Sequence, residues 1–388
     1  MKRTNIVSVS WGDHLAFGEQ DGRLDRPDRL RRRMETWKTE LGASVIHWRE
    51  LRSRLDGYFF SQDETRPRKG SAPPTHWDDF AEICAAGHAL EFRVYLYVTL
   101  FDEGWPLPSR RERETSYHNA QHARHVSWQS AFSRENPEFT VVDRAGRRRQ
   151  WGVLSLAYPA VREHFLHRFL GLLSDYDFDG LFVCFRSQSR PADDADEFGF
   201  NPPVRDDFLQ RTGLDLLNDP FNRQAWRDLR GGYLTRFLTE LRAALDRRGL
   251  RLAVGVPRGR IMGPPLGNQT LEWSKWIEAG LVDDLVIDQD SSRCPSTWLD
   301  LWPMHRGRGY LGPDPGGQTH PPLEEELQNE YLPHLAGRAT RLYLARQWHP
   351  RSEPIEAALL RNPAVSGLVF SSFRFDNPGP VSRGDWRR

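Results

Sequence analysis

Residues 176–186 read Tyr-Asp-Phe-Asp-Gly-Leu-Phe-Val-Cys-Phe-Arg, a pattern typical of a helix end, a tight turn and a buried strand that stops at an arginine. The preceding residues 159–173 carry apolar side chains at three- and four-residue steps, as an amphipathic helix requires. A helix, a short turn, a buried strand and a charged strand end form one repeat of an α/β barrel. Chemistry in such barrels lies at the carboxyl ends of the strands, so Arg186 marks a candidate site.

Strand-like and helix-like patterns alternate along the whole chain. The predicted strands are residues 6–10, 43–48, 92–100, 181–185, 250–256, 285–287, 341–345 and 367–370. The predicted helices are residues 26–41, 77–86, 159–173, 225–248, 272–279, 323–335 and 353–361. Long loops, 106–158 and 187–219, follow the third and fourth strands, and loops of this length are usually functional or hold inserted elements. Eight strands separated by helices predict a single (β/α)8 barrel domain over residues 1–388, with a doubly wound sheet as the alternative.

The composition restricts the classes of partner. The chain has 388 residues, 54 basic and 53 acidic, so its charge gives no case for a nucleic-acid or acidic-membrane partner. The first residues lack the apolar region of a signal peptide, and no apolar run is long enough to span a membrane. Cys84, Cys184 and Cys294 are far apart and odd in number, which disfavours a disulfide framework and fits the cytoplasm. The oligomeric state is left open.

Three segments occur together in an order that is known from other proteins. The first is Glu135–Gly146, followed by Leu154–Arg162; the second is Tyr176–Gly180, and the third is Trp276–Asp283. Together they resemble the family-10-like glycosyl hydrolases, bacterial barrel proteins with a His-Pro-Glu-Trp…Asp-x-x-Gly segment, a Pro-x-Val-Arg helix start, an Asp-Gly-Ile-x-Leu-Asp strand and a Gly-Leu-Val-Asp turn. The resemblance covers residues 130–290 and implies a (β/α)8 fold with carbohydrate as the ligand.

One position departs from that family. The carboxylate at the end of the family's fourth strand falls on Cys184 here, whereas Asp179 matches the aspartate that precedes the strand. Arg186 shares the side-chain parity of Cys184. The family's acidic position therefore cannot be transferred, and either the carboxylates lie at other strand ends or the chemistry differs.

Glycoside hydrolysis needs two carboxyl groups across the scissile bond, one to protonate the leaving oxygen and one to attack the anomeric carbon or activate water. The candidates near predicted strand ends are Asp288, Asp290, Asp102, Glu50 and Glu197. A charge directly after the apolar run 285–287 is costly unless it is paired or used, so Asp288 is the first candidate. Glu50, Asp102 or Glu197 is its expected partner. The competing interpretation of each is a salt bridge or a polar loop.

The strand ends also concentrate groups that bind sugars. Indole rings cover the apolar face of a pyranose, and arginine and glutamine side chains hydrogen-bond its hydroxyls. The candidate substrate-binding residues are His14, Trp48, Arg49, Trp105, Arg186, Arg258, Arg346, Gln347 and Trp348. Converging arginines also predict an anionic substrate group such as a uronic acid, since guanidinium groups bind carboxylates bidentately. The competing interpretation is that these arginines neutralise the barrel's own acids.

No cofactor or metal is expected. His118, His122 and His125 have helical spacing, but no matching aspartate or cysteine motif accompanies them. Cys184 is expected to be a buried structural thiol, and no Gly-x-Ser-x-Gly or dinucleotide-binding motif is present. The prediction is a cytoplasmic glycoside hydrolase that acts on a sugar or oligosaccharide. The alternatives are a non-catalytic carbohydrate-binding barrel and a lyase acting on uronates.

Overall fold

The structure is a computed structural model, and eight parallel strands in it close into a barrel. The described residues are 3–10, 24, 26–50, 57–60, 68–70, 77–104, 127–185, 196–263, 266–291, 323–345 and 357–371, without the side chains of 58–60, 68–70, 127–128, 288–291 and 371. The barrel strands are β1 (Asn5–Val9), β2 (Ala43–Arg49), β5 (Arg93–Thr99), β9 (Gly180–Cys184), β10 (Arg251–Arg258), β11 (Asp284–Ser291), β12 (Arg341–Ala345) and β13 (Val365–Ser371). Each of the eight predicted strands is present, so the barrel is confirmed and the doubly wound alternative is wrong.

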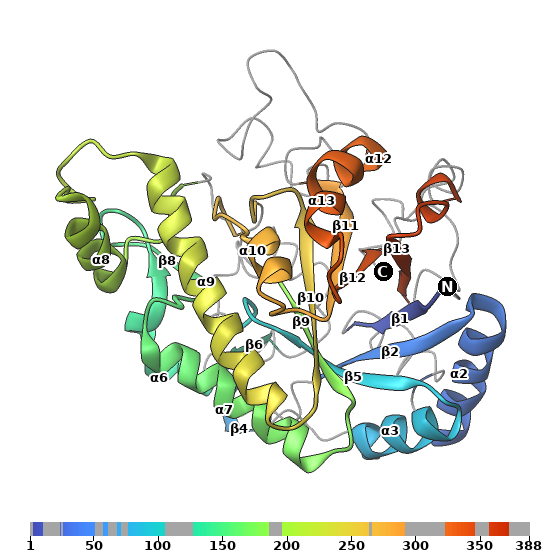
Figure 1. The fold of residues 1–388 in the computed structure, drawn as a ribbon. Coiled ribbons are helices and arrows are strands. Elements are labelled where there is room, and N and C mark those ends of the chain that lie inside the picture. Colours follow the sequence, from blue (N-terminus) through green and yellow to red (C-terminus); the bar gives the residue numbers. More distant parts are fainter. Residues whose placement is uncertain are drawn as a thin grey trace, which may run out of the picture.

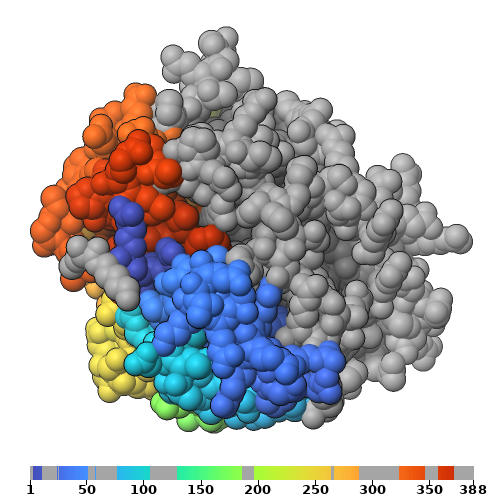
Figure 2. Space-filling model, turned by 90° about the vertical axis from the view of Figure 1, so that its right-hand side faces the viewer, coloured from blue at the N-terminus to red at the C-terminus, as the bar shows by residue number. Residues whose placement is uncertain are grey.

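The order around the barrel is β1-β13-β12-β11-β10-β9-β5-β2, and the first and last strands close it. Ile6 of β1 pairs in register with Val369 of β13 on one side and with Val45 of β2 on the other. Figure 2 shows the consequence at the surface, where the earliest segments, in blue, lie against the latest, in red.

Alternation along each strand separates two cores. One side of every strand faces the barrel interior, where Val45, Tyr95, Phe182, Ala253 and Val286 form part of a single buried cluster. The other side packs on the helices in a larger cluster. Because the side-chain period of a strand is two residues, this alternation also decides which residues at the strand ends face the mouth of the barrel.

Helices cover the outside of the barrel (Figure 1). They are α2 (Pro27–Leu41), α3 (Asp79–Ala89), α7 (Pro159–Asp175), α9 (Arg223–Asp246), α10 (Trp273–Glu278), α12 (Leu323–Glu326) and α13 (Leu332–Leu335), with a π-helical turn, Leu327–Tyr331, between the last two. Local signals set their ends: Gly42 terminates α2 with a φ of 60°, and the Asp78 side chain accepts the backbone N–H of Ala81 at the start of α3. The predicted helix at 353–361 is described only from residue 357.

The two long loops after β5 and β9 contain elements that were not predicted. These are β6 (Ser127–Ser130), α6 (Ala131–Glu135), a 3-10 turn (Pro137–Phe139), β7 (Thr140–Val142), β8 (Arg149–Leu154) and α8 (Pro202–Thr212). The strand β6 pairs with β3 (Gly57–Phe60), which pairs with β4 (Arg68–Gly70). The Asn201 amide donates to the Thr140 carbonyl over 2.9 Å and so joins the two loops. Figure 1 shows α6, β8 and α8 gathered on one flank of the barrel.

A partly buried ion pair lies at the amino ends of the strands. Arg341 Nε and Nη2 donate to the two carboxylate oxygens of Asp284 over 2.7 and 2.9 Å, and the Tyr95 hydroxyl lies 3.4 Å from the same carboxylate. Asp284 is fully buried. This end of the barrel is therefore held by a polar cluster, opposite the end where chemistry is expected.

None of the helices in the described part of the chain is both long and apolar enough to cross a bilayer.

Candidate active site

The carboxyl ends of β2 and β5 bring Arg49 and Asp102 together. Arg49 pairs in register with Tyr97 and its guanidinium lies over that interior ring, 5.2 Å from the centroid. Arg49 Nη2 donates to Thr99 Oγ1 over 2.8 Å and lies 3.6 Å from Asp102 Oδ2. Both charged side chains are buried, with 7% and 3% of their surfaces exposed. A buried acid and its cation thus occupy the end of the barrel where active sites form.

Glu50 lies behind this pair, on the helix side of β2. Its Oε1 is 3.5 Å from Nη2 of Arg168, a residue of α7, and Arg168 Nη1 donates to Glu103 Oε1 over 2.6 Å. Burial raises the pKa of Glu50, and this effect is larger than the lowering by the positive charges of Arg168 and Arg49. The structure therefore brings Glu50 to α7 rather than to the barrel interior.

Asp288 and Asp290 lie within β11, which runs further than the predicted 285–287. The backbone of Asp288 pairs in register with Ala345 of β12. Strand β11 is three places from β5 around the closed barrel, so the ends of these strands lie on different sides of the mouth. The side chains of Asp288 and Asp290 lie outside the described residues.

Glu197 and Arg258 each form an ion pair away from the barrel interior. Glu197 Oε1 lies 2.5 Å from Arg148 Nη2, which follows the turn of the β7–β8 hairpin. Arg258, at the end of β10, donates to Glu326 of α12, and both side chains are buried. Arg49 lies beside Asp102 in the same way. Two of the four arginines named as candidate binding residues are thus paired with acids of the chain itself, as the competing interpretation predicts.

Trp48 is part of the core. Its side chain is fully buried among apolar residues of the outer layer, and its indole N–H donates to Asp79 Oδ2 over 2.7 Å. The structure thus gives this ring no face on which a sugar can stack, and it corrects the expectation of a sugar platform. Successive side chains of a strand point to opposite faces of the sheet. Because Arg49 faces the barrel interior, the preceding residue Trp48 faces the outer layer.

Several predicted binding residues lie outside the described part of the chain. They are His14, Trp105, Arg186, Arg346, Gln347 and Trp348, and the histidines 118, 122 and 125 also fall there.

The barrel interior below the Arg49–Asp102 pair contains His47, Phe182 and Cys184. His47 stacks on Phe182 with ring centroids 4.0 Å apart, and burial lowers the pKa of His47 to about 3, so the ring is neutral near pH 7. Cys184 is buried in the same cluster as a free thiol, as expected. Ser8 of β1, which pairs in register with His47, and Ala345 of β12 are partly exposed. Among the described residues no group of three or more histidine, cysteine or acidic side chains could hold a metal ion.

Sequence reasoning missed Arg168, although a signal was present. Arg168 lies three residues after Phe165 and seven after Val161, on the apolar face of α7. A charged residue in such a stripe is expected to have a buried partner.

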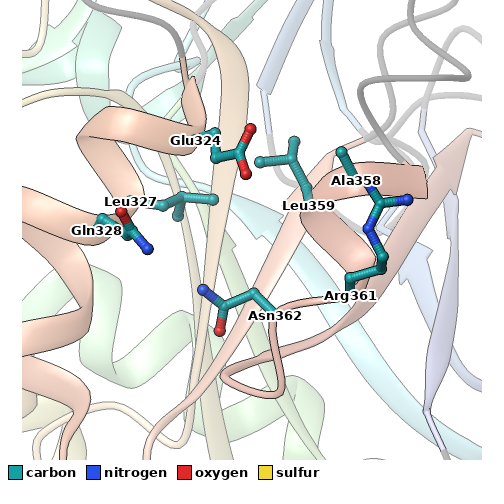
Figure 3. A pocket seen from close by; sticks show the side chains of 7 residues that line it. All are labelled: Glu324, Leu327, Gln328, Ala358, Leu359, Arg361 and Asn362. Carbon is teal, nitrogen blue, oxygen red and sulfur yellow. The ribbon is translucent and has the colours of Figure 1, made fainter.

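A cavity of about 210 Å³ lies in the outer layer of the molecule. Glu324, Leu327 and Gln328 line one side, and the other side is lined by Ala358, Leu359, Arg361 and Asn362 (Figure 3). Its walls are helices that precede β12 and β13, so it is separate from the strand ends described above.

The barrel is shared with known glycoside hydrolases. The glycoside hydrolase domain of PgaB (BpsB) from Bordetella bronchiseptica superposes with a TM-score of 0.53 at 15% identity, covering 97% of this chain and 96% of that one. The β-galactosidase of the psychrophilic Marinomonas ef1 superposes with a TM-score of 0.51 at 11% identity over 95% of this chain, which spans only 53% of the β-galactosidase. At these identities the likeness establishes the fold. No protein-family model and no curated protein matches the chain, so the resemblance to the family-10-like group stays a prediction.

Proposed function

We propose that the protein is a glycoside hydrolase whose two carboxyl groups are Asp102 and Asp288. The observation that carries the proposal is the buried Asp102 carboxyl beside Arg49 at the carboxyl end of β5. Asp288 is the natural partner because it belongs to β11, three places around the barrel, so a glycosidic bond bound at the mouth fits between the two strand ends.

The surroundings of Asp102 suggest how the roles divide. The positive charge of Arg49 suits the member of the pair that works as an anion, either as the nucleophile or as the base that activates water. Asp288 then protonates the leaving glycosidic oxygen. The substrate is a carbohydrate, and the pairing of Arg49 and Arg258 with acids of the chain favours a neutral glycoside over a uronate.

The test is a panel of 4-nitrophenyl glycosides and oligosaccharides that includes a β-D-galactoside, since one structural neighbour is a β-galactosidase, and matched uronates. We expect turnover of at least one neutral glycoside, and a loss of about 100- to 10,000-fold in kcat in both Asp102→Asn and Asp288→Asn with binding retained. Glu197→Gln is the matched control, because Glu197 is a buried acid that is paired with Arg148.

Three results would overturn the proposal, each in a different way. Sugar binding by the wild type without turnover identifies a non-catalytic binding barrel. Release of an unsaturated product from uronates identifies a lyase. Full activity in Asp102→Asn shows that the Arg49–Asp102 pair is a structural ion pair and that other carboxylates act.

A further inference from the structure

Arg168 reaches from α7 to the ends of two neighbouring strands. Its Nη1 donates to Glu103 Oε1 over 2.6 Å, and its Nη2 lies 3.5 Å from Glu50 Oε1 and 3.5 Å from the carbonyl oxygen of Thr99. Only 13% of its side chain is exposed. One buried guanidinium therefore contacts both the end of β2 and the end of β5.

Each acid that Arg168 contacts is next in sequence to a residue of the proposed site. Glu50 follows Arg49, and Glu103 follows Asp102. Arg49 lies over the interior ring of Tyr97, whereas Glu50 contacts α7 on the other side of the wall. A shift of either acid behind the wall therefore moves its neighbour at the mouth.

The end of β5 is also held through its backbone. The Glu103 N–H donates to the Gly152 carbonyl over 3.0 Å, and the Ser130 N–H donates to the Glu103 carbonyl over 2.9 Å. Gly152 and Ser130 belong to β8 and β6, the strands within the long loop after β5. Glu103 is thus fixed by its main chain and by Arg168, and Arg168 also connects it to the Glu50 side chain, which follows β2.

A purely stabilising role accounts poorly for this cluster. Removing charges from water costs several kcal/mol per ion, and buried ion clusters can often be replaced by apolar side chains without loss of stability. The cluster gives something that apolar packing does not, which is a set of directional contacts that place two strand ends relative to each other.

We propose that Arg168 is a positioning residue that sets the separation of Arg49 and Asp102 at the mouth of the barrel. The proposal rests on the proposed function, since it assigns Arg168 a part in the same site. Arg168 acts through Glu50 and Glu103 and makes no contact with the substrate itself.

The test removes the cluster without leaving an unpaired buried charge. The triple variant Arg168→Met/Glu50→Gln/Glu103→Gln is compared with the double variant Arg162→Met/Glu240→Gln. The double variant removes another buried arginine of α7 together with its partner on α9, whose carboxylate lies 3.0 Å away. The measurements are a crystal structure, the melting temperature, and kcat and KM across pH on the glycoside that the wild type turns over.

We expect the triple variant to fold, to widen the 3.6 Å Arg49–Asp102 separation by about 1 Å, and to lose about 100-fold in kcat with little change in KM. The control pair should change only the melting temperature. An unchanged separation together with a wild-type kcat and pH profile overturns the positioning role. Full activity in Asp102→Asn instead overturns the proposed function, and the crystallographic separation then still decides whether Arg168 positions the pair.

Discussion

Glu50 and Glu103 end neighbouring strands and share one cation, Arg168, yet their acidities shift in opposite directions. Burial raises the pKa of Glu50, whose carboxylate is 3.5 Å from the guanidinium. Burial is also the largest influence on Glu103, but Arg168 at 2.6 Å, His164 and hydrogen bonds from Ser130 and Arg168 outweigh it, so that the pKa of Glu103 lies below its ordinary value. The two acids should therefore contribute to stability in opposite ways as the pH changes.

We expect Glu50→Gln to become more stable relative to the wild type as the pH rises. The pKa of Glu50 is raised above its ordinary 4.5, so its contribution to stability is present below that value and is lost as the pH rises through the folded-state pKa. Glutamine carries no charge to bury and does not undergo this loss. Urea unfolding between about pH 4 and about pH 8 measures the difference.

Glu103→Gln is the matched control, with the reverse sign. The pKa of Glu103 is lowered, so its contribution is present above the ordinary value and is lost as the pH falls through the folded-state pKa. The deficit of this variant should be largest near neutrality and should shrink in acid. The same pH trend in both variants would show that the two carboxyl groups are not distinguished by their surroundings.

Asp284→Asn should destabilise the protein by about 1–3 kcal/mol, because a neutral amide replaces the fully buried carboxylate that pairs with Arg341. The change lies at the amino ends of the strands, so kcat of the proposed hydrolase should be unaffected. Urea unfolding gives the free energy. The double variant Asp284→Leu/Arg341→Met should recover most of the loss, and a double variant as unstable as the single one contradicts the pairing.

Trp48→Phe should lower the free energy of unfolding by about 1–3 kcal/mol without changing KM, since it leaves the buried Asp79 carboxylate without its indole donor. A double-mutant cycle with Asp79→Asn isolates the energy of that contact. A tenfold rise in KM with unchanged stability is the contrary result, because it would mean that the ring binds sugar.

Two adjacent glycines of α9 should respond in opposite ways to alanine. A Cβ on Gly231 would lie 2.4 Å from the Thr270 carbonyl oxygen, a backbone atom, so Gly231→Ala should cost about 1–3 kcal/mol. A Cβ on Gly232 meets nothing within 4 Å, so Gly232→Ala should gain about 0.5–1 kcal/mol through helix propensity. Thermal melting of the two variants should move in opposite directions, and equal shifts would contradict the close approach of α9 to Thr270.

The strands were predictable because each depends on residues close to it in sequence. All eight barrel strands fall where runs of apolar, β-branched and aromatic residues occur, as in the strand that ends at Cys184. The glycine that ends α2 and the position of Asp102, three residues after the end of β5, are local in the same sense. The strands β6 and β7 inside the first long loop were missed, since strands of three or four residues have too few positions to show a period. The six-residue strand β8 and the eleven-residue helix α8 were missed as well, although they are longer.

The sequence by itself determined the order of elements and the acids that follow the strands, because hydrophobic periodicity acts over a few neighbouring residues. Only the tertiary structure decided which of those groups lie together. Trp48 hydrogen-bonds to Asp79, and Arg258 pairs with Glu326. Arg168 contacts both Glu50 and Glu103. The physical reason is that a buried polar or charged group needs a partner within about 4 Å. Barrel closure and strand register decide which residue lies that close, and this residue can be far away in the sequence.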